Sequence, residues 1–258
     1  MTIHYQLEGR DDAPVVILSN SLGTDLSMWN GQRDALLPHF RVLRYDTHGH
    51  GQTAKIGKVT LAQLGEDVLN IMTREGIDKA HFCGISMGGL TGLWLARFAP
   101  ERFYSVTVAN SAAKVGDQAG WLSRARTVRQ EGMPVLAAGA ADRWFTRAFR
   151  QKSPAVVEPL VHTLAASNAE GYAECCEALA GADLRAEVGE ITLPLLLIAG
   201  EADPVTTVAD SEFLREQVSG AQMVTLPASH LSNIEAASQF NAALLGFLQQ
   251  QEGNSDAR

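Results

Sequence analysis

Short apolar runs alternate with segments of helical periodicity along most of the chain. Each run is bounded by polar or turn-forming residues and has the length of a short buried strand. The strands predicted in this way are 15–18, 42–45, 81–84, 106–109, 195–199 and 223–226. Because helices usually connect parallel strands and cover the sheet they form, this alternation predicts an α/β fold with a doubly covered, mostly parallel sheet.

The segment 61–74 shows how the connecting helices are recognised. Its apolar residues recur at helical spacing, and Thr60 precedes it as a candidate N-cap. The residues that share one face are Leu61, Leu64, Val68 and Ile71. The segment is therefore predicted to be a helix that packs on the sheet.

A further extended segment lies near the start of the chain. Residues 3–7 precede the polar turn 9–12, after which the first parallel strand begins. A short polar turn between two extended segments favours an antiparallel pair. The sheet is therefore expected to be mixed, with residues 3–7 paired to strand 15–18 at an edge.

The alternation stops in the middle of the chain. From residue 115 to 188 there is no strand-like run, only helical stretches rich in Ala, Arg and Glu, and strands resume at Pro194. We therefore predict an α/β core of residues 1–114 and 189–250, interrupted by a helical cap at 115–188. The polar tail 251–258 is predicted to be frayed.

Composition narrows the function classes. The chain has 258 residues, 46% of them hydrophobic, and a formal net charge of -8, which is enough length for one large core. The acidic balance disfavours a nucleic-acid partner, since that would favour a basic surface. No segment approaches the ~18 apolar residues of a membrane span, and residues 1–9 lack the pattern of a secretory leader. We expect a cytoplasmic protein without a nucleic-acid or membrane partner.

The cysteines predict neither a disulfide framework nor a metal site. The chain has three, Cys83, Cys175 and Cys176, which is an odd number without metal-ligand spacing. They fall in an apolar strand and in a helical segment, where a thiol usually packs in the core. No metal and no other cofactor is expected.

A candidate nucleophile, Ser86, follows strand 81–84 in the sequence Gly84-Ile85-Ser86-Met87-Gly88. The two glycines of this G-x-S-x-G motif permit a sharp turn between a strand and a helix, which exposes the serine hydroxyl at the carboxyl end of the strand. The amino end of the helix that follows points at the developing oxyanion. The alternative is a turn that serves packing only.

A serine hydroxyl becomes a good nucleophile when an imidazole accepts its proton and a carboxylate orients that imidazole. Asp203 follows strand 195–199, and His230 follows strand 223–226, so both are expected at the carboxyl edge of the sheet. Glu201 is the nearest rival carboxylate. The alternatives are an aspartate that opens a turn before Pro204 and a solvated loop histidine.

An oxyanion hole needs two backbone N–H groups, one of them from the residue after the nucleophile, which is Met87. The other is expected from Leu22, in the loop Asn20-Ser21-Leu22-Gly23 after the first parallel strand. Asn20 is expected to brace this loop, and we count it among the tentative substrate-binding residues. A turn without any ligand role is the alternative.

The loop 46–51 holds an aspartate and two histidines, Asp46, His48 and His50. The histidines are two residues apart on a glycine-rich turn, and no further ligand cluster accompanies them, which disfavours a metal site. We predict a structural loop near the active-site face.

These motifs make nearly the whole chain similar to α/β-hydrolases, and several segments resemble the 3-oxoadipate enol-lactonase branch of that family. The segments are 19–24 with Met28-Trp29, 44–51, 84–89, and Arg143-Trp144-Phe145-Thr146 in the cap. The first and the last carry most of the discrimination. The resemblance implies that Ser86, Asp203 and His230 form the triad.

The resemblance also implies the reaction, which opens 3-oxoadipate enol-lactone to 3-oxoadipate in the breakdown of protocatechuate or catechol. The substrate is then a small anionic lactone, and its free carboxylate needs a cation or a hydrogen-bond donor. Trp144 and Arg143 in the cap are the first candidates, followed by Arg124 and Arg126. Packing of Trp144 and solvation of the arginines is the alternative.

Two other functions stay open from the sequence. One is a carboxylesterase or a carbon–carbon bond hydrolase on the same scaffold. The other is a small-ligand receptor that retains the fold without turnover. A serine at position 86 disfavours dehalogenase or epoxide hydrolase chemistry, which on this fold uses a carboxylate nucleophile. The sequence predicts no particular oligomeric state.

Overall fold

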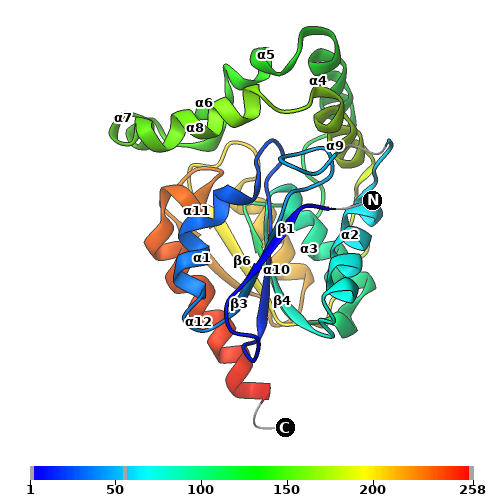
Figure 1. Ribbon diagram of the computed structural model, residues 1–258, viewed down its shortest axis with the longest axis vertical. Coiled ribbons are helices and arrows are strands. Elements are labelled where there is room, and N and C mark those ends of the chain that lie inside the picture. Colours follow the sequence, from blue (N-terminus) through cyan, green and yellow to red (C-terminus); the bar gives the residue numbers. More distant parts are fainter. Residues whose placement is uncertain (1–2, 55–56, 256–258) are drawn as a thin grey trace.

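A computed structural model describes residues 3–54 and 57–255 of the chain (Figure 1). Within these residues, seven strands form one sheet. Their bounds are β1 Tyr5–Glu8, β2 Val15–Ser19, β3 Arg41–Tyr45, β4 Ala80–Ile85, β5 Phe103–Ala109, β6 Leu195–Gly200 and β7 Gln222–Leu226. The six predicted parallel strands are therefore present, each within a few residues of its expected bounds.

The strands lie in the order β1-β3-β2-β4-β5-β6-β7, and all neighbours are parallel except β1 and β3. The sheet is mixed, as predicted, and β1 is at an edge. The predicted partner of β1 is wrong, because β1 pairs with β3 in the register Tyr5↔Tyr45 and not with β2. β2 already has parallel neighbours on both sides, β3 and β4, so it has no free edge for β1.

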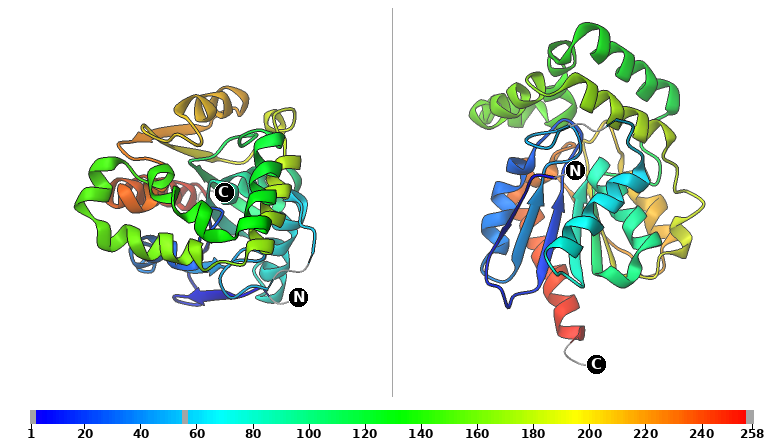
Figure 2. Two further views of the ribbon diagram at one scale, coloured as in Figure 1. Left: turned by 90° about the horizontal axis from the view of Figure 1, so that it is seen from above. Right: turned by 45° about the vertical axis from the view of Figure 1, so that its right-hand side comes forward.

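Helices cover both faces of the sheet (Figures 1 and 2). On one face lie α2, α3 and α10, and on the other lie α1, α11 and α12. Their bounds are α1 Asn30–Leu36, α2 Leu61–Arg74, α3 Met87–Phe98, α10 Val208–Gln217, α11 Ser232–Glu235 and α12 Ala237–Ser255. Short 3₁₀ turns are found at η1 Leu26–Trp29, η2 Pro100–Arg102 and η3 Val188–Glu190.

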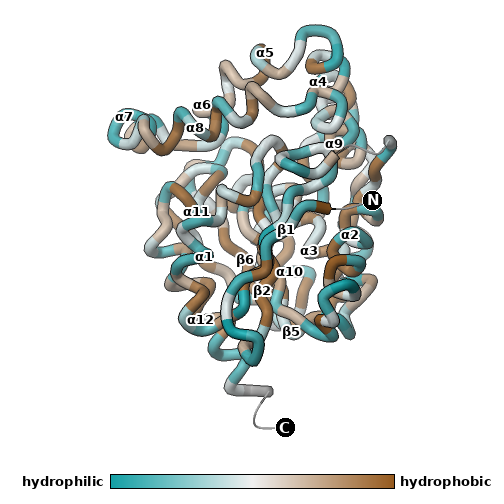
Figure 3. The backbone as a smooth tube through the Cα atoms, viewed as in Figure 1, coloured by the Kyte–Doolittle hydropathy of each residue, from teal (hydrophilic) through white to brown (hydrophobic). Residues whose placement is uncertain are grey.

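This double cover explains why the central strands are apolar on both sides. Every residue of β2, β4 and β6 is buried, and the hydropathy colouring of Figure 3 shows hydrophobic stretches along β2 and β6. β7, at the other edge of the sheet, is only partly buried. The three cysteines, Cys83, Cys175 and Cys176, are buried and free, as predicted.

The helices between β5 and β6 form a separate layer over the carboxyl ends of the strands (Figures 1 and 2). They are α4 Gln118–Glu131, α5 Met133–Ala137, α6 Ala140–Trp144, α7 Arg147–Lys152, α8 Pro154–Ala165 and α9 Ala169–Gly181. Within this layer α4 packs along α9, and α5 packs on α8. All six helices fall inside the range 115–188 that the sequence analysis assigns to a cap.

The end of the chain differs from the prediction. α12 continues to Ser255, so residues 251–255 are helical and the prediction of a frayed tail is wrong for them; residues 256–258 lie outside the described part. Glu252 accounts for the difference, since its Oε1 lies 2.7 Å from Nε2 of the buried His81 in β4.

Among residues 3–54 and 57–255, none of the helices combines the length and the hydropathy needed to cross a bilayer.

Helix α2 has an N-cap that contributes to its stability and can be tested by mutation. The Oγ1 of Thr60 accepts a hydrogen bond from the N–H of Gln63 at 3.2 Å, which satisfies one amide of the first turn. We expect Thr60→Ala to lower the free energy of unfolding by about 1 kcal/mol. Thr73→Ala, at an exposed position of the same helix, is the matched control and should change it by less than about 0.5 kcal/mol. Urea denaturation of both variants measures the difference, and equal effects would exclude the cap.

Candidate active site

Ser86 occupies a sharp turn between β4 and α3. Its backbone has φ 58° and ψ -117°, a conformation that non-glycine residues rarely adopt. The turn requires close backbone approach, because a Cβ on Gly84 would lie 2.0 Å from the carbonyl oxygen of Gly88. The G-x-S-x-G motif therefore forms the strand-turn-helix that the sequence predicts, with the serine at the carboxyl edge of the sheet.

Ser86, His230 and Asp203 form one hydrogen-bonded chain. The Nε2 of His230 lies 2.9 Å from Oγ of Ser86, and its Nδ1 lies 2.8 Å from Oδ2 of Asp203. All three residues are buried, although they are up to 144 positions apart in the sequence. In this arrangement Nδ1 donates to the carboxylate, which leaves Nε2 free to accept the serine proton.

The carboxylate of Asp203 is held from several sides. Oδ1 accepts from the N–H of Val205 at 2.8 Å and of Thr206 at 3.1 Å, and Oδ2 accepts from Oγ1 of Thr206 at 2.9 Å. The Nδ2 of Asn110 donates to Oδ2 at 3.0 Å. Burial by itself raises the pKa of Asp203, but the hydrogen bond and charge of His230, with the donors of Asn110 and Val205, bring the pKa below its ordinary value. Asp203 is therefore ionised at neutral pH.

Asn110 is a residue of this site that the sequence analysis missed. It follows β5 directly and has a positive φ of 43°. Besides Asp203, its Nδ2 contacts the carbonyl oxygen of Ser229 at 3.0 Å, and its Oδ1 accepts from Oγ of Ser232 at 2.5 Å. Asn110 thus connects the aspartate to the loop of His230. Its position at the end of an apolar strand was a usable signal, the same one that identified Asp203.

The two expected oxyanion donors lie beside Ser86. Among the described residues, the backbone N–H groups of Leu22 and Met87 have no hydrogen-bond acceptor, and Leu22 and Ser86 line the same pocket. The N–H of Gly88 donates to the carbonyl oxygen of Asn20 at 3.1 Å, which joins the Leu22 loop to the first turn of α3. Both free N–H groups are thus carried by segments that contact each other.

Asn20 braces the loop and does not line the pocket. Both polar atoms of its side chain have partners inside the protein: Oδ1 accepts from Nε1 of Trp29 at 3.0 Å, and Nδ2 donates to the carbonyl oxygen of Tyr45 at 2.8 Å. The bracing role has direct contacts in the structure, whereas the tentative substrate-binding role has none.

Residues of the core and of the cap helices line the pocket above Ser86. They are Ser21, Leu22, Ser86, Trp121, Arg124, Arg143, Trp144, Leu164, Tyr172, Val205 and His230. The candidates Arg143 and Trp144 are thus brought to the nucleophile, whereas Arg126 is exposed and outside the lining. Trp121, Leu164 and Tyr172 were missed, because which face of a cap helix looks down onto the sheet is decided by its packing.

The pocket has a positive side. Neither Arg124 nor Arg143 forms an ion pair with a carboxylate of the described residues. Burial lowers the pKa of Arg143, and the charge of Arg124 lowers it further, which shows that the two guanidinium groups repel each other. An anionic group bound between them would relieve this repulsion.

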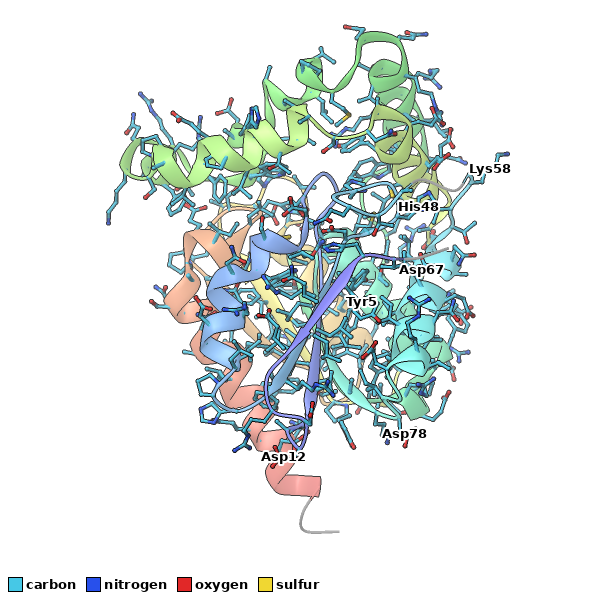
Figure 4. All side chains as sticks on the ribbon, in the orientation of Figure 1. Tyr5, Asp12, His48, Lys58, Asp67 and Asp78 are labelled. Carbon is cyan, nitrogen blue, oxygen red and sulfur yellow. The ribbon has the colours of Figure 1, made fainter. Side chains whose placement is uncertain are left out.

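The rival candidates are elsewhere. Glu201 is exposed and is not among the pocket residues. His48 is paired with Glu174 of α9 at 2.8 Å, and among the described residues no three metal-ligating side chains are gathered into a possible site. Figure 4 shows His48 at the side of the molecule near α2 and α9.

Comparison with known proteins adds the family context. The sequence profile of the alpha/beta hydrolase fold matches residues 14–237. Two relatives from Acinetobacter baylyi, 3-oxoadipate enol-lactonases 1 and 2, are 48% and 49% identical over 96% and 95% of this chain and 93% and 92% of their own. The solved structure of the enol-lactonase from Burkholderia xenovorans LB400 superposes with a TM-score of 0.94 and 45% identity, over 96% of each chain.

The tight turn at the nucleophile gives a prediction about glycine. A Cβ on Gly88 would lie 2.2 Å from the backbone oxygen of Ser19, so Gly88→Ala should force α3 away from β2, destabilise the fold by about 1–3 kcal/mol and reduce hydrolysis. The control is Gly246→Ala in α12, where nothing lies within 4 Å; it should stabilise by about 0.5–1 kcal/mol, because alanine favours a helix interior. Thermal unfolding of both variants measures the difference. Destabilisation by Gly88→Ala alone would support the close packing at Gly88, whereas destabilisation by both would indicate a general intolerance of glycine replacement.

Proposed function

Because the chain belongs to the α/β-hydrolase family and, within it, to the 3-oxoadipate enol-lactonases, we propose that it opens 3-oxoadipate enol-lactone to 3-oxoadipate in the breakdown of aromatic compounds. The observation that carries the proposal is the hydrogen-bonded chain Ser86–His230–Asp203. It supplies a nucleophile, a base and an orienting carboxylate, which is the equipment for acyl transfer.

In the first half of the reaction, Oγ of Ser86 attacks the lactone carbonyl while Nε2 of His230 takes its proton. Asp203 keeps Nδ1 protonated and stabilises the imidazolium that forms. The oxygen of the tetrahedral intermediate accepts hydrogen bonds from the N–H groups of Leu22 and Met87. The amino end of α3 contributes its dipole at the same point.

Collapse of the intermediate breaks the ring's acyl carbon–oxygen bond. The leaving oxygen is an enolate, which takes the proton from His230 and ketonises, so the ring opens to an acyl-enzyme on Ser86. A water molecule then attacks the ester carbonyl, with His230 again accepting a proton. His230 returns this proton to Ser86 Oγ as the ester bond breaks, and 3-oxoadipate leaves as a diacid.

The free carboxylate of the lactone fits the positive side of the pocket. Arg124 of α4 and Arg143 of α6 line the pocket with Ser86 and lack a carboxylate partner in the described residues. A carboxylate between them gains charge-assisted hydrogen bonds, and each contact is worth roughly 1.5–3 kcal/mol. Trp144, buried beside them, gives the lactone ring an apolar wall.

The same proposal assigns the region 115–188 the role of a cap, because it supplies both arginines and the aromatic wall while the core supplies the triad. The partner is a small anionic lactone. With a formal net charge of -8 and no helix in the described residues that could span a bilayer, cytoplasmic action without nucleic acid fits best.

The first experiment follows loss of the lactone's ultraviolet absorbance after addition of purified protein. We expect rapid loss with the wild type and a decrease in kcat of more than about 10⁴-fold for Ser86→Ala, since the triad acts as a unit. Cleavage of simple aryl esters without loss of the lactone would retain a carboxylesterase and reject the lactonase. Tight lactone binding without any product would instead indicate a receptor.

Carboxylate recognition is tested by neutralising the arginines. Arg124→Gln and Arg143→Gln should each raise KM for the lactone by about 10-fold or more and leave cleavage of a neutral aryl ester nearly unchanged. Arg126→Gln is the matched control, because Arg126 lies on α4 with Arg124 but is exposed. Equal KM values in all three variants would contradict the assignment of Arg124 and Arg143 to the carboxylate.

The role of Trp144 is tested separately. Trp144→Phe with unchanged KM and kcat for the lactone would remove Trp144 from the binding site.

A further inference from the structure

The loop after β3 reaches the candidate oxyanion hole through one side chain, His50. This residue is buried, and both of its ring nitrogens have a backbone partner. Nδ1 lies 2.9 Å from the carbonyl oxygen of His48, and Nε2 lies 3.0 Å from the amide nitrogen of Gly23. Gly23 follows Leu22, whose N–H is the proposed oxyanion donor.

The two backbone partners fix the tautomer of the ring. A carbonyl oxygen only accepts, so Nδ1 of His50 carries the proton and donates to His48. Nε2 then has a free lone pair and accepts from the N–H of Gly23. Burial lowers the pKa of His50, which favours the neutral ring that this arrangement needs.

We propose that His50 is a positioning residue that holds the Leu22–Gly23 peptide in the orientation in which the Leu22 N–H faces the oxyanion. The inference rests on the proposed acyl-transfer function. Its physical basis is that Gly23 N–H and Leu22 C=O belong to one rigid peptide plane. The preceding peptide plane, which carries the Leu22 N–H, is joined to it through the φ and ψ angles of Leu22, so fixing the Leu22–Gly23 plane limits the directions in which the Leu22 N–H can point. An oxyanion donor is effective only when it is oriented before the charge develops.

The loop that carries His50 is itself anchored. Oδ1 of Asp46 accepts from the N–H of Leu26 at 2.9 Å, and Oδ2 accepts from the N–H of Gln52 at 2.9 Å. Gly51 packs directly on this carboxylate, since a Cβ there would lie 2.3 Å from it. Asp46, at the start of the loop that carries His50, therefore binds both the far end of this loop at Gln52 and Leu26 in the segment after β2.

The cap packs on the same peptide. Gly23 has φ +82°, and a Cβ on it would lie 2.5 Å from Leu164 of α8 and 3.2 Å from Tyr172 of α9. The ring of Tyr172 also lies 6.2 Å from that of His50. The Leu22–Gly23 peptide is thus held by a hydrogen bond to His50 and by apolar contacts with the cap.

The test compares three variants with the wild type on 3-oxoadipate enol-lactone. His50→Phe keeps a planar ring against Tyr172 but removes the acceptor, whereas His50→Gln carries Oε1 near the position of Nε2. His81→Phe is the control, because His81 is a buried histidine that contacts Ser105 and Glu252, away from the pocket. Circular dichroism and melting temperature are measured for each.

We expect His50→Phe to lower kcat by about 10- to 100-fold with KM changed less than about 2-fold, since a misdirected donor weakens transition-state binding and not ground-state binding. His50→Gln should recover most of this loss. His81→Phe should lower the melting temperature and leave kcat unchanged. A folded His50→Phe with wild-type kcat, or a folded His50→Gln as impaired as His50→Phe, would overturn the proposal.

Two further measurements test the role of His50 in other ways. The first does not use the lactone, and the second does not need a variant. The rate at which a fluorophosphonate reacts with Ser86 depends on the oxyanion hole but not on the lactone. If the wild type ignores the lactone but reacts with this reagent, the proposed function fails, and the variants' reaction rates still decide on His50. Nitrogen NMR shifts of the wild-type ring report its tautomer, and a proton on Nε2 of His50 would exclude acceptance from Gly23.

Discussion

The close approach of α3 to the sheet is the constraint on which the site depends. Gly84 lets β4 approach the backbone of α3, and Gly88 lets α3 approach the end of β2, with no side chain between them, and this close packing forces Ser86 into its strained backbone conformation. The strain is maintained because both flanking elements are buried in the core. The turn aims the hydroxyl out of the carboxyl edge and leaves the Met87 N–H without an acceptor in the described residues. One packing condition thus positions the proposed nucleophile and the proposed oxyanion donor together.

The second requirement is electrostatic. A buried carboxylate is costly unless donors surround it, and Asp203 receives donors from His230, Asn110, Val205 and Thr206. These donors keep it charged, so it can orient His230 and stabilise an imidazolium. Because Asn110 also holds the loop of His230, the charge and the geometry of the triad depend on the same side chain.

The cap and the early loops meet at the remaining parts of the site. Arg124 and Arg143 bring positive charge over an acidic chain's active site, and Leu164 and Tyr172 press on Gly23 next to the proposed oxyanion donor. The proposed carboxylate-binding residues and the proposed oxyanion donor therefore line one pocket, and the cap contacts both parts. A change in the packing of α8 or α9 would therefore affect both the arginines that line the pocket and the peptide next to Leu22.

The sequence by itself determined the six parallel strands, helix α2 with its Thr60 cap, and the strand-end positions of Ser86, Asp203 and His230, because periodicity and turn chemistry act over a few residues. Tertiary structure alone decided the pairing of β1 with β3, the anchoring of residues 251–255 through Glu252 and His81, and the contact of Asn110 with Asp203. It also decided which arginines face the pocket. These features depend on contacts between residues that are distant in the chain, or on which face of an element is covered, and no local pattern encodes either.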